Sequence, residues 1–199
     1  MQYPKTSLTE PSRHKDRISY EQEKVFHLLD EALFCTLSYS VSGQAFSMPT
    51  MHVRLGDQLY VHGSSKSHFL LSMPQDQKAC ISVTLLEGLV LAHSAFGHSM
   101  NYRSLVLFGK PGEVKGETLK LEVLKAMVNK AKAGRWEENI RRPSEGEMKA
   151  TLVYAFDIKE VSYKTRQGPP NDSLEDQQID VWTGVIPLKL MAQPAVEDK

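Results

Sequence analysis

Short apolar segments separated by turn residues are the feature that most limits what this chain can fold into. They alternate, or are rich in β-branched and aromatic side chains, and span residues 34–40, 45–54, 58–62, 78–92, 101–109, 151–163 and 180–190. Turn signals such as Ser42-Gly43-Gln44 and Gly56-Asp57 join several of them at hairpin length. The pattern predicts a mainly β chain with few α-helices, folded as an antiparallel barrel.

Two other segments have helical periodicity. Residues 20–32 carry apolar side chains at helical spacing, and Ser19 with Gln22 has the form of a capping box before them. Residues 117–131 form an amphipathic stripe. We therefore expect a polar tail over 1–17, one domain over 18–190 and a C-terminal tail over 191–199.

Charge and composition exclude several classes of partner. Lys plus Arg and Asp plus Glu are both 24 of 199 residues, so the formal net charge is zero. That balance argues against a nucleic-acid binder and against a polybasic membrane surface. No apolar run approaches the roughly 20 residues of a membrane-spanning helix, and residues 1–17 lack the apolar core of a signal peptide. A cytoplasmic protein is expected.

Cysteine and histidine spacing gives no metal signature. Cys35 and Cys80 form no CxxC pair and are predicted to be reduced, buried thiols. His93 and His98 lie five residues apart with no carboxylate or cysteine beside them in the sequence, so we expect no metal site.

The segment after the strand 58–62 has the composition of a phosphate-binding loop. Gly63 permits a tight turn, and an ammonium group at Lys66 arrives together with the hydroxyls of Ser64, Ser65 and Ser67. Hydroxyls, loop N–H groups and a lysine beside a helix start suit a phosphate dianion. An ordinary turn that caps the next helix explains the same residues.

Two further segments have open interpretations. Arg103, at the start of the strand 101–109, can pair with a phosphate or with a surface carboxylate. Pro49 interrupts a strand, and since proline cannot donate to a ladder, it marks a bulge, an edge or a ligand lying against the strand.

Taken in chain order, these segments resemble the flavin-binding split-barrel family that contains pyridoxamine 5′-phosphate oxidase. The likeness is greatest to the branch that includes the nitroimidazole-resistance proteins. It is carried by Met-Pro at 48–49, LYVHGS at 59–64, GLVLA at 88–92, SMNYRS at 99–104, KTRQGPP at 164–170 and WTGVIP at 182–187.

The resemblance implies a homodimer of split six-stranded antiparallel barrels with two flavin mononucleotides (FMN) at the subunit interface. It assigns the phosphate to His62, Gly63, Ser64, Ser65, Lys66 and Ser67. It places the isoalloxazine along Pro49, Thr50, Met51 and His52. Arg103 and Ser104 would reach the phosphate–ribityl region, and Trp182 would approach from the neighbouring subunit. His62 and His52 are the candidate catalytic residues near the polar edge of the ring, as proton donors or hydrogen-bond partners.

The chain departs from true pyridoxamine phosphate oxidases. Residues 47–52 contain neither the arginine nor the lysine of their ring-side strand, and residues 182–187 lack the arginine pair that binds the substrate phosphate. We therefore predict a nitroreductase-like or oxidase-like FMN oxidoreductase of another small molecule. Two alternatives are open: a flavin-binding module without turnover that acts as sensor or electron store, or a relative that binds haem or a deazaflavin.

Overall fold

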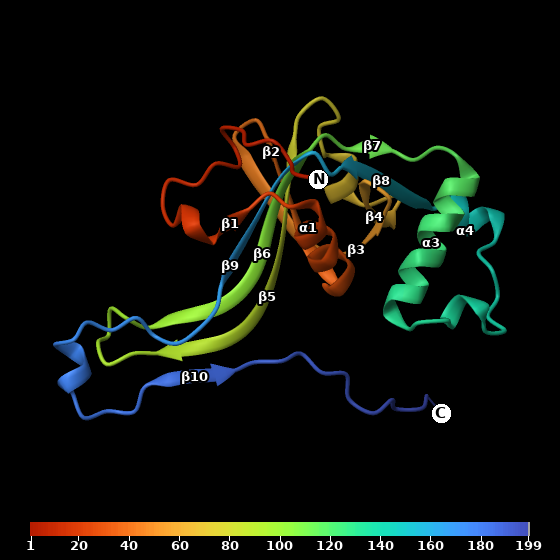
Figure 1. Cartoon of the computed structure of the whole chain (residues 1–199). Helices are drawn as coiled ribbons and strands as arrows, with labels where there is room; N and C mark the ends of the chain where they lie inside the picture. The colour runs from red at the N-terminus through yellow and green to blue at the C-terminus, as the bar shows by residue number, and fades with distance from the viewer. Residues whose placement is uncertain (199) are drawn as a thin grey trace. The chain divides into compact units, whose positions relative to one another are not determined.

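The computed structural model describes residues 1–198 (Figure 1). They contain ten antiparallel strands and four α-helices. The strands are β1 (Ile18–Ser19), β2 (Phe34–Val41), β3 (Gln44–Leu55), β4 (Gln58–Ser64), β5 (Ala79–Leu91), β6 (Ser99–Gly109), β7 (Gly112–Glu113), β8 (Thr151–Asp157), β9 (Glu160–Arg166) and β10 (Gly184–Pro187). The helices are α1 (Gln22–Glu31), α2 (His68–Leu71), α3 (Glu117–Ala131) and α4 (Glu145–Lys149). The predicted mainly β, split-barrel fold is confirmed.

The strand order is β1-β9-β6-β5-β2-β3-β4-β8-β7, with β10 paired to β5. Hairpins at β2–β3 and β3–β4 follow the predicted turns. At the first of them Ser42 and Gly43 both have positive φ, 49° and 82°, as a two-residue turn of the type that matches strand twist requires. The β3–β4 hairpin pairs His52 with Val61, the residue just before the predicted loop segment 62–67.

Pro49 lies at an edge. It pairs with Thr36 of β2 in a continuous register, whereas β3 pairs with β4 only from His52 to Leu55. The missing N–H of Pro49 therefore interrupts no bond to β4, and no bulge is needed to accommodate it.

Three local predictions are wrong. Residues 151–163 form two strands, β8 and β9, because the chain turns at Ile158 and Lys159. The capping box is absent, since Glu21 is the N-cap of α1 and Ser19 Oγ donates to the Glu21 carboxylate instead. The last strand covers only Gly184–Pro187, after a 3-10 turn at Asp176–Gln178.

The described chain divides into two compact units. Unit 1 consists of residues 1–84 and 104–164, and unit 2 of residues 85–103 and the described part of 165–199. In unit 1, α1 and α3 both pack against β3 (Figure 1). One of its core clusters joins β3, β4, β8 and α3 through Val53, Tyr60, Val114, Val123, Met127 and Val153.

The N-terminal segment of unit 1 is attached rather than free. The N–H of Tyr3 donates to the Tyr20 carbonyl at 2.8 Å, and the Tyr20 hydroxyl donates to the Thr9 carbonyl at 2.9 Å. Tyr3, Thr9 and Tyr20 are buried. The segment 1–17, predicted as a polar tail, thus contributes buried side chains beside β1 and α1.

Unit 2 contains the C-terminal half of β5, the start of β6 and β10, which runs along β5 from Gly184↔Leu91 to Pro187↔Gly88 (Figure 1). Its buried residues within 1–198 are Gly88, Val90, Ala92 and Asn101. Most of the chain's exposed large apolar side chains belong to it. They are Leu86, Leu89, Phe96, Met100, Leu174, Ile179, Val181, Trp182, Ile186, Leu188, Leu190, Met191 and Val196.

None of the helices described in residues 1–198 is long and apolar enough to cross a bilayer. Cys35 and Cys80 are free thiols. Cys35 is buried as predicted, whereas Cys80 is only partly buried. Burial raises the pKa of Cys35 to about 12.

Candidate functional site

The loop 63–67 connects the end of β4 to α2 and is fixed by its own backbone. Ser65 N–H donates to the Ala150 carbonyl at 2.8 Å, and Ser67 N–H to the Ser64 carbonyl at 2.9 Å. Lys66 N–H donates to Ser64 Oγ at 3.1 Å. Ser67 Oγ caps α2 by accepting from Leu70 N–H. The N–H groups of Ser65, Lys66 and Ser67 therefore all have acceptors within the protein, and any anion here must be bound by side chains.

Those side chains fit a phosphate. Lys66 and Ser64 are exposed, and Ser65 is half-buried. Within residues 1–198, the Lys66 ammonium and the Ser65 hydroxyl have no internal partner, and Ser64 Oγ only accepts from Lys66 N–H. One ammonium and two free O–H donors beside each other can make charge-assisted hydrogen bonds to an anion.

Gly63 allows the loop to follow β4 closely. A Cβ at this position would lie 2.7 Å from Cδ1 of the buried Leu70. A side chain at residue 63 would displace the residue that anchors α2, so the glycine has a packing reason in addition to the turn.

His62 supplies an unsatisfied polar atom next to this loop. Its Nδ1 is buried and has no hydrogen-bond partner among the described residues. Burial lowers the pKa of His62, so its imidazole is neutral at pH 7. A buried polar atom without a partner costs free energy unless something bonds to it. This is the second observation that fits a ligand at the end of β4.

His52 lies elsewhere in unit 1. Its side chain is fully buried, and Nε2 is 2.9 Å from the carbonyl oxygen of Leu29, near the C-terminus of α1. Lys130 of α3 donates to the same carbonyl at 2.8 Å. These two side chains satisfy a helix-end carbonyl that α1 leaves open. Burial first, and then the Lys130 charge, lower the pKa of His52 to about 4. Acting as a proton donor to a ligand would require His52 to leave this contact.

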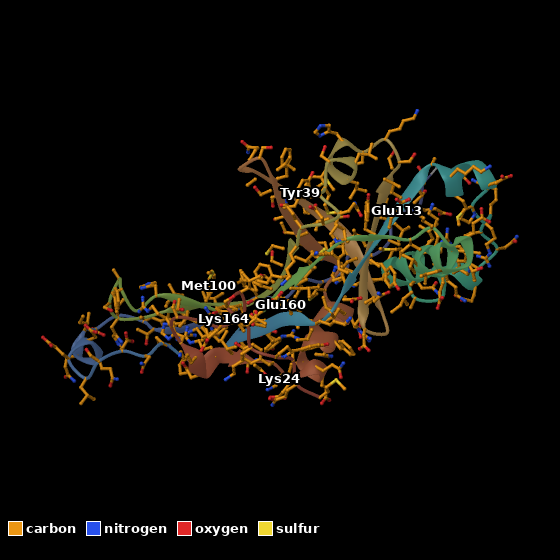
Figure 2. All side chains as sticks on the ribbon, turned by 90° about the horizontal axis from the view of Figure 1, so that it is seen from above. Lys24, Tyr39, Met100, Glu113, Glu160 and Lys164 are labelled. Carbon is orange, nitrogen blue, oxygen red and sulfur yellow. The ribbon has the colours of Figure 1, made fainter. Side chains whose placement is uncertain are left out.

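The resemblance also places Pro49, Thr50 and Met51 of β3 along the isoalloxazine ring. Pro49 is exposed, whereas Thr50 and Met51 are half-buried. The side chain of Tyr39, on the neighbouring strand β2, donates to the Phe69 carbonyl and so ties β2 to α2 (Figure 2). The contact of Pro49, Thr50 and Met51 with a flavin ring stays a prediction.

Arg103 is engaged with a carboxylate. Its Nε donates to Glu87 Oε1 at 2.5 Å, and both side chains are partly buried in unit 2. Ser104, which belongs to unit 1, donates to the Lys164 carbonyl at 3.4 Å. Lys66 and Arg103 are in different units. Their shared contact with one phosphate therefore stays a prediction, as does the interfacial position of Trp182, which is 64% exposed.

The motif at 164–170 has a structural explanation within unit 2. The Arg166 guanidinium donates to Asn101 Oδ1 and to the carbonyls of Gly168 and Pro169, and Asn101 Nδ2 also donates to Gly168. Gly168 has φ +103°, which only glycine adopts readily. These bonds fix the turn after β9 against β6 and thereby fix the residues that follow it.

Asp172, which follows this turn, forms a pair with His93 that the sequence did not indicate. Asp172 Oδ2 lies 2.7 Å from His93 Nδ1, and both carboxylate oxygens lie 3.2 Å from His93 N. No carboxylate stands beside His93 in the sequence, since Asp172 comes from 79 positions further along the chain. No local spacing could have indicated it.

Comparison with known proteins identifies the family. Residues 21–165 match the family model described as pyridoxamine 5′-phosphate oxidase. The chain belongs to this family. None of the curated proteins matches the chain.

Two solved structures resemble this family member over almost its whole length. The flavocytochrome Anf3 from Azotobacter vinelandii is 35% identical with a TM-score of 0.91, and the match covers 97% of this chain and 89% of that chain. The FAD and haem binding protein from Mycobacterium smegmatis is 32% identical with a TM-score of 0.81, covering 91% of each chain.

A candidate 5-nitroimidazole antibiotic resistance protein from Bacteroides thetaiotaomicron is 16% identical with a TM-score of 0.62, over 74% of this chain and 85% of that chain. At that identity the likeness concerns the fold alone.

Proposed function

We propose that the chain is a flavocytochrome-type oxidoreductase that binds a flavin and a haem. The observation that carries this proposal is the likeness, at 35% and 32% identity over nearly the whole chain, to a flavocytochrome and to an FAD and haem binding protein. One alternative from the sequence is a relative that binds haem in place of a flavin; we propose that this protein binds both.

The loop after β4 supports the flavin half of the proposal. A bound flavin supplies hydride and single-electron chemistry, while the protein supplies binding and electrostatics. Lys66 and the hydroxyls of Ser64 and Ser65 hold the phosphate. The neutral His62 bonds a polar group of the ligand through its otherwise unsatisfied Nδ1.

Unit 2 supports the haem half. It exposes many large apolar side chains, which a porphyrin face can cover, and it contains histidines with one ring nitrogen already bonded. Neutral imidazole is a common axial ligand of haem iron.

We assign the flavin as FAD, although the resemblance predicts FMN, because the Mycobacterium smegmatis relative is described as an FAD binding protein. Denaturing the purified protein and separating the released flavin by chromatography tests the assignment. FAD is the expected product, and release of FMN alone would restore the original prediction.

We further propose that the working unit is a homodimer that does not oxidise pyridoxamine 5′-phosphate. The exposed apolar side chains of unit 2 suit a second copy as well as a cofactor. The substrate of the named oxidase carries a phosphate dianion, and residues 47–52 and 182–187 contain no arginine to pair with it. No turnover of pyridoxamine 5′-phosphate is expected, and turnover at the rate of a genuine oxidase would contradict this.

Anaerobic titration tests the oxidoreductase activity. The protein loaded with both cofactors is mixed with NADH, NADPH or dithionite, and the flavin and haem absorption bands are followed separately. We expect a nicotinamide donor to reduce the flavin first and the haem afterwards. Reduction by dithionite alone would contradict a nicotinamide-driven oxidoreductase and favour a flavin-binding module without turnover.

A further inference from the structure

The seven histidines differ in which ring nitrogen is free. A histidine that ligates a metal through Nε2 usually donates its Nδ1–H to a carboxylate, carbonyl or water, which fixes the ring. Within residues 1–198, Nδ1 is bonded to an oxygen only in His93 and His98, and in neither does Nε2 bond another residue. In His27, His52 and His68 it is Nε2 that is engaged.

The partner of His93 is a carboxylate that faces both its ring and its backbone. Asp172 Oδ2 is 2.7 Å from His93 Nδ1, and both carboxylate oxygens are 3.2 Å from the His93 backbone N. A carboxylate oxygen accepts hydrogen bonds, so Nδ1 of His93 is the ring nitrogen that donates to Asp172. Nε2 is therefore the ring nitrogen left for a metal.

The pair is also shielded from solvent. The His93 side chain is 15% exposed and that of Asp172 is 4% exposed. Asp172 follows the turn at Gly168, which Asn101 and Arg166 hold against β6. His98, by contrast, is exposed, and its Nδ1 is bonded only to the Ser94 carbonyl within its own loop.

Apolar side chains flank the pair along both segments. Phe96 is 99% exposed and lies in the same loop as His93, and Leu174 follows Asp172 by two residues and is also exposed. Met100 projects from the start of β6 (Figure 2) and is half exposed. Large apolar groups left in water on the segments that carry a partly buried histidine–carboxylate pair are what a flat apolar ligand with a metal centre would cover.

We propose that His93 is an axial ligand of the haem iron through Nε2, and that Asp172 is the residue that positions it. This inference rests on the proposed function, because it needs the protein to bind haem. It adds the identity of the residue that binds the iron and the role of Asp172 in orienting that residue.

Asp172 has a second consequence. A carboxylate bonded to Nδ1–H makes the imidazole a stronger electron donor to the metal, which favours the oxidised ferric iron. The pair is therefore expected to lower the haem reduction potential relative to a histidine bonded to a neutral group.

The direct test is His93→Gly with and without free imidazole. The purified variant is titrated with haemin, and the Soret band and the iron coordination state are recorded. We expect the variant to lose one axial ligand and to regain the wild-type spectrum when imidazole fills the vacated position. An unchanged spectrum in His93→Gly overturns the proposal.

His98→Gly is the matched control, because it removes the other histidine of the same loop with a bonded Nδ1. We expect it to keep the wild-type spectrum. Loss of the ligand in His98→Gly, with rescue by imidazole, would transfer the assignment to His98 and overturn the one made for His93.

Asp172→Asn tests the positioning residue. Loss of such a partner typically weakens metal binding by about 10- to 100-fold. We expect weaker haem binding together with a raised reduction potential of the haem. Weaker binding without a change of potential would leave Asp172 a merely structural role and contradict its effect on the iron.

The proposed function can fail separately. If the wild-type protein takes up no haem while circular dichroism shows it folded, haem binding itself is refuted. If the wild-type protein binds haem and His93→Gly binds it identically, only the ligand assignment is refuted.

Discussion

Unit 1 and unit 2 differ in how many of their large apolar side chains are buried. All the largest fully buried side chains of the described chain, among them Phe156, Leu37 and Leu107, lie in unit 1. Unit 2 buries few side chains and leaves most of its large apolar ones in water. A soluble surface rarely keeps such groups exposed without a partner or ligand. Unit 1 thus has a buried apolar core of its own, whereas the exposed apolar side chains of unit 2 are the basis of the haem and dimer proposals.

Core substitutions give the largest expected difference between the two units. Phe156→Ala removes a fully buried ring and should lower the free energy of unfolding by about 3–5 kcal/mol. Leu174→Ala, at an exposed position of unit 2, should change it by no more than about 0.5 kcal/mol. Urea denaturation measures both. Equal losses of the free energy of unfolding in the two variants would contradict the difference in burial between the units.

Acid should weaken unit 1 through His52. The pKa of His52 is about 4 when folded, against about 6.5 in an unfolded chain, so the unfolded state binds the proton more readily. Its contribution is complete above about pH 6.5 and is lost as the pH falls towards 4, by about 3 kcal/mol in total. His52→Gln removes this group, so the free energy of unfolding should vary less between pH 6.5 and 4. An equally steep dependence in the variant would show that other groups cause it.

Flavin affinity tests the phosphate contacts that the resemblance predicts for Lys66 and Arg103. Each charge-assisted hydrogen bond is worth about 1.5–3 kcal/mol, so Lys66→Ala should weaken flavin binding roughly 10- to 100-fold. Arg103→Ala in addition should weaken it further, as the resemblance predicts for this residue. Lys110→Ala, at an exposed lysine outside the site, is the control. A double variant that keeps its flavin through dialysis would contradict the phosphate site.

Self-association should depend on unit 2 more than on unit 1. Interface tryptophans commonly contribute more than 1 kcal/mol, so Trp182→Ala should raise the dimer dissociation constant roughly tenfold. Leu71→Ala, an exposed apolar position of unit 1, should leave it unchanged. Sedimentation at a series of concentrations distinguishes the two variants. A monomer that carries a full complement of flavin would rule out an interfacial site.

Features that depend on neighbouring residues could be predicted from the sequence. Helix α3 and hairpin β2–β3 depend on periodicity and on turn residues such as Gly43, and both were predictable. The loop 63–67 was predictable for the same reason, since its donors are neighbours in the chain. Only its internal bonding, which leaves side chains rather than N–H groups for an anion, required coordinates.

Contacts between distant residues were not predictable. Asp172 reaches His93 across 79 positions, and His52 bonds Leu29 across 23. Composition and spacing describe neighbours in sequence, whereas these pairs depend on the turn at Gly168 and on the packing of α1 and α3 on β3. The division into two units has the same origin, because each unit is assembled from two separate stretches of chain.

The absorption spectrum of the purified, cofactor-loaded protein, recorded before and after reduction with dithionite, decides whether the protein is a flavocytochrome. We expect flavin bands that bleach on reduction and a Soret band that shifts to that of ferrous haem, both in the same preparation. A flavin spectrum without haem bands after incubation with haemin would contradict the flavocytochrome assignment. A spectrum with neither chromophore after incubation with FAD, FMN and haemin would contradict the account as a whole.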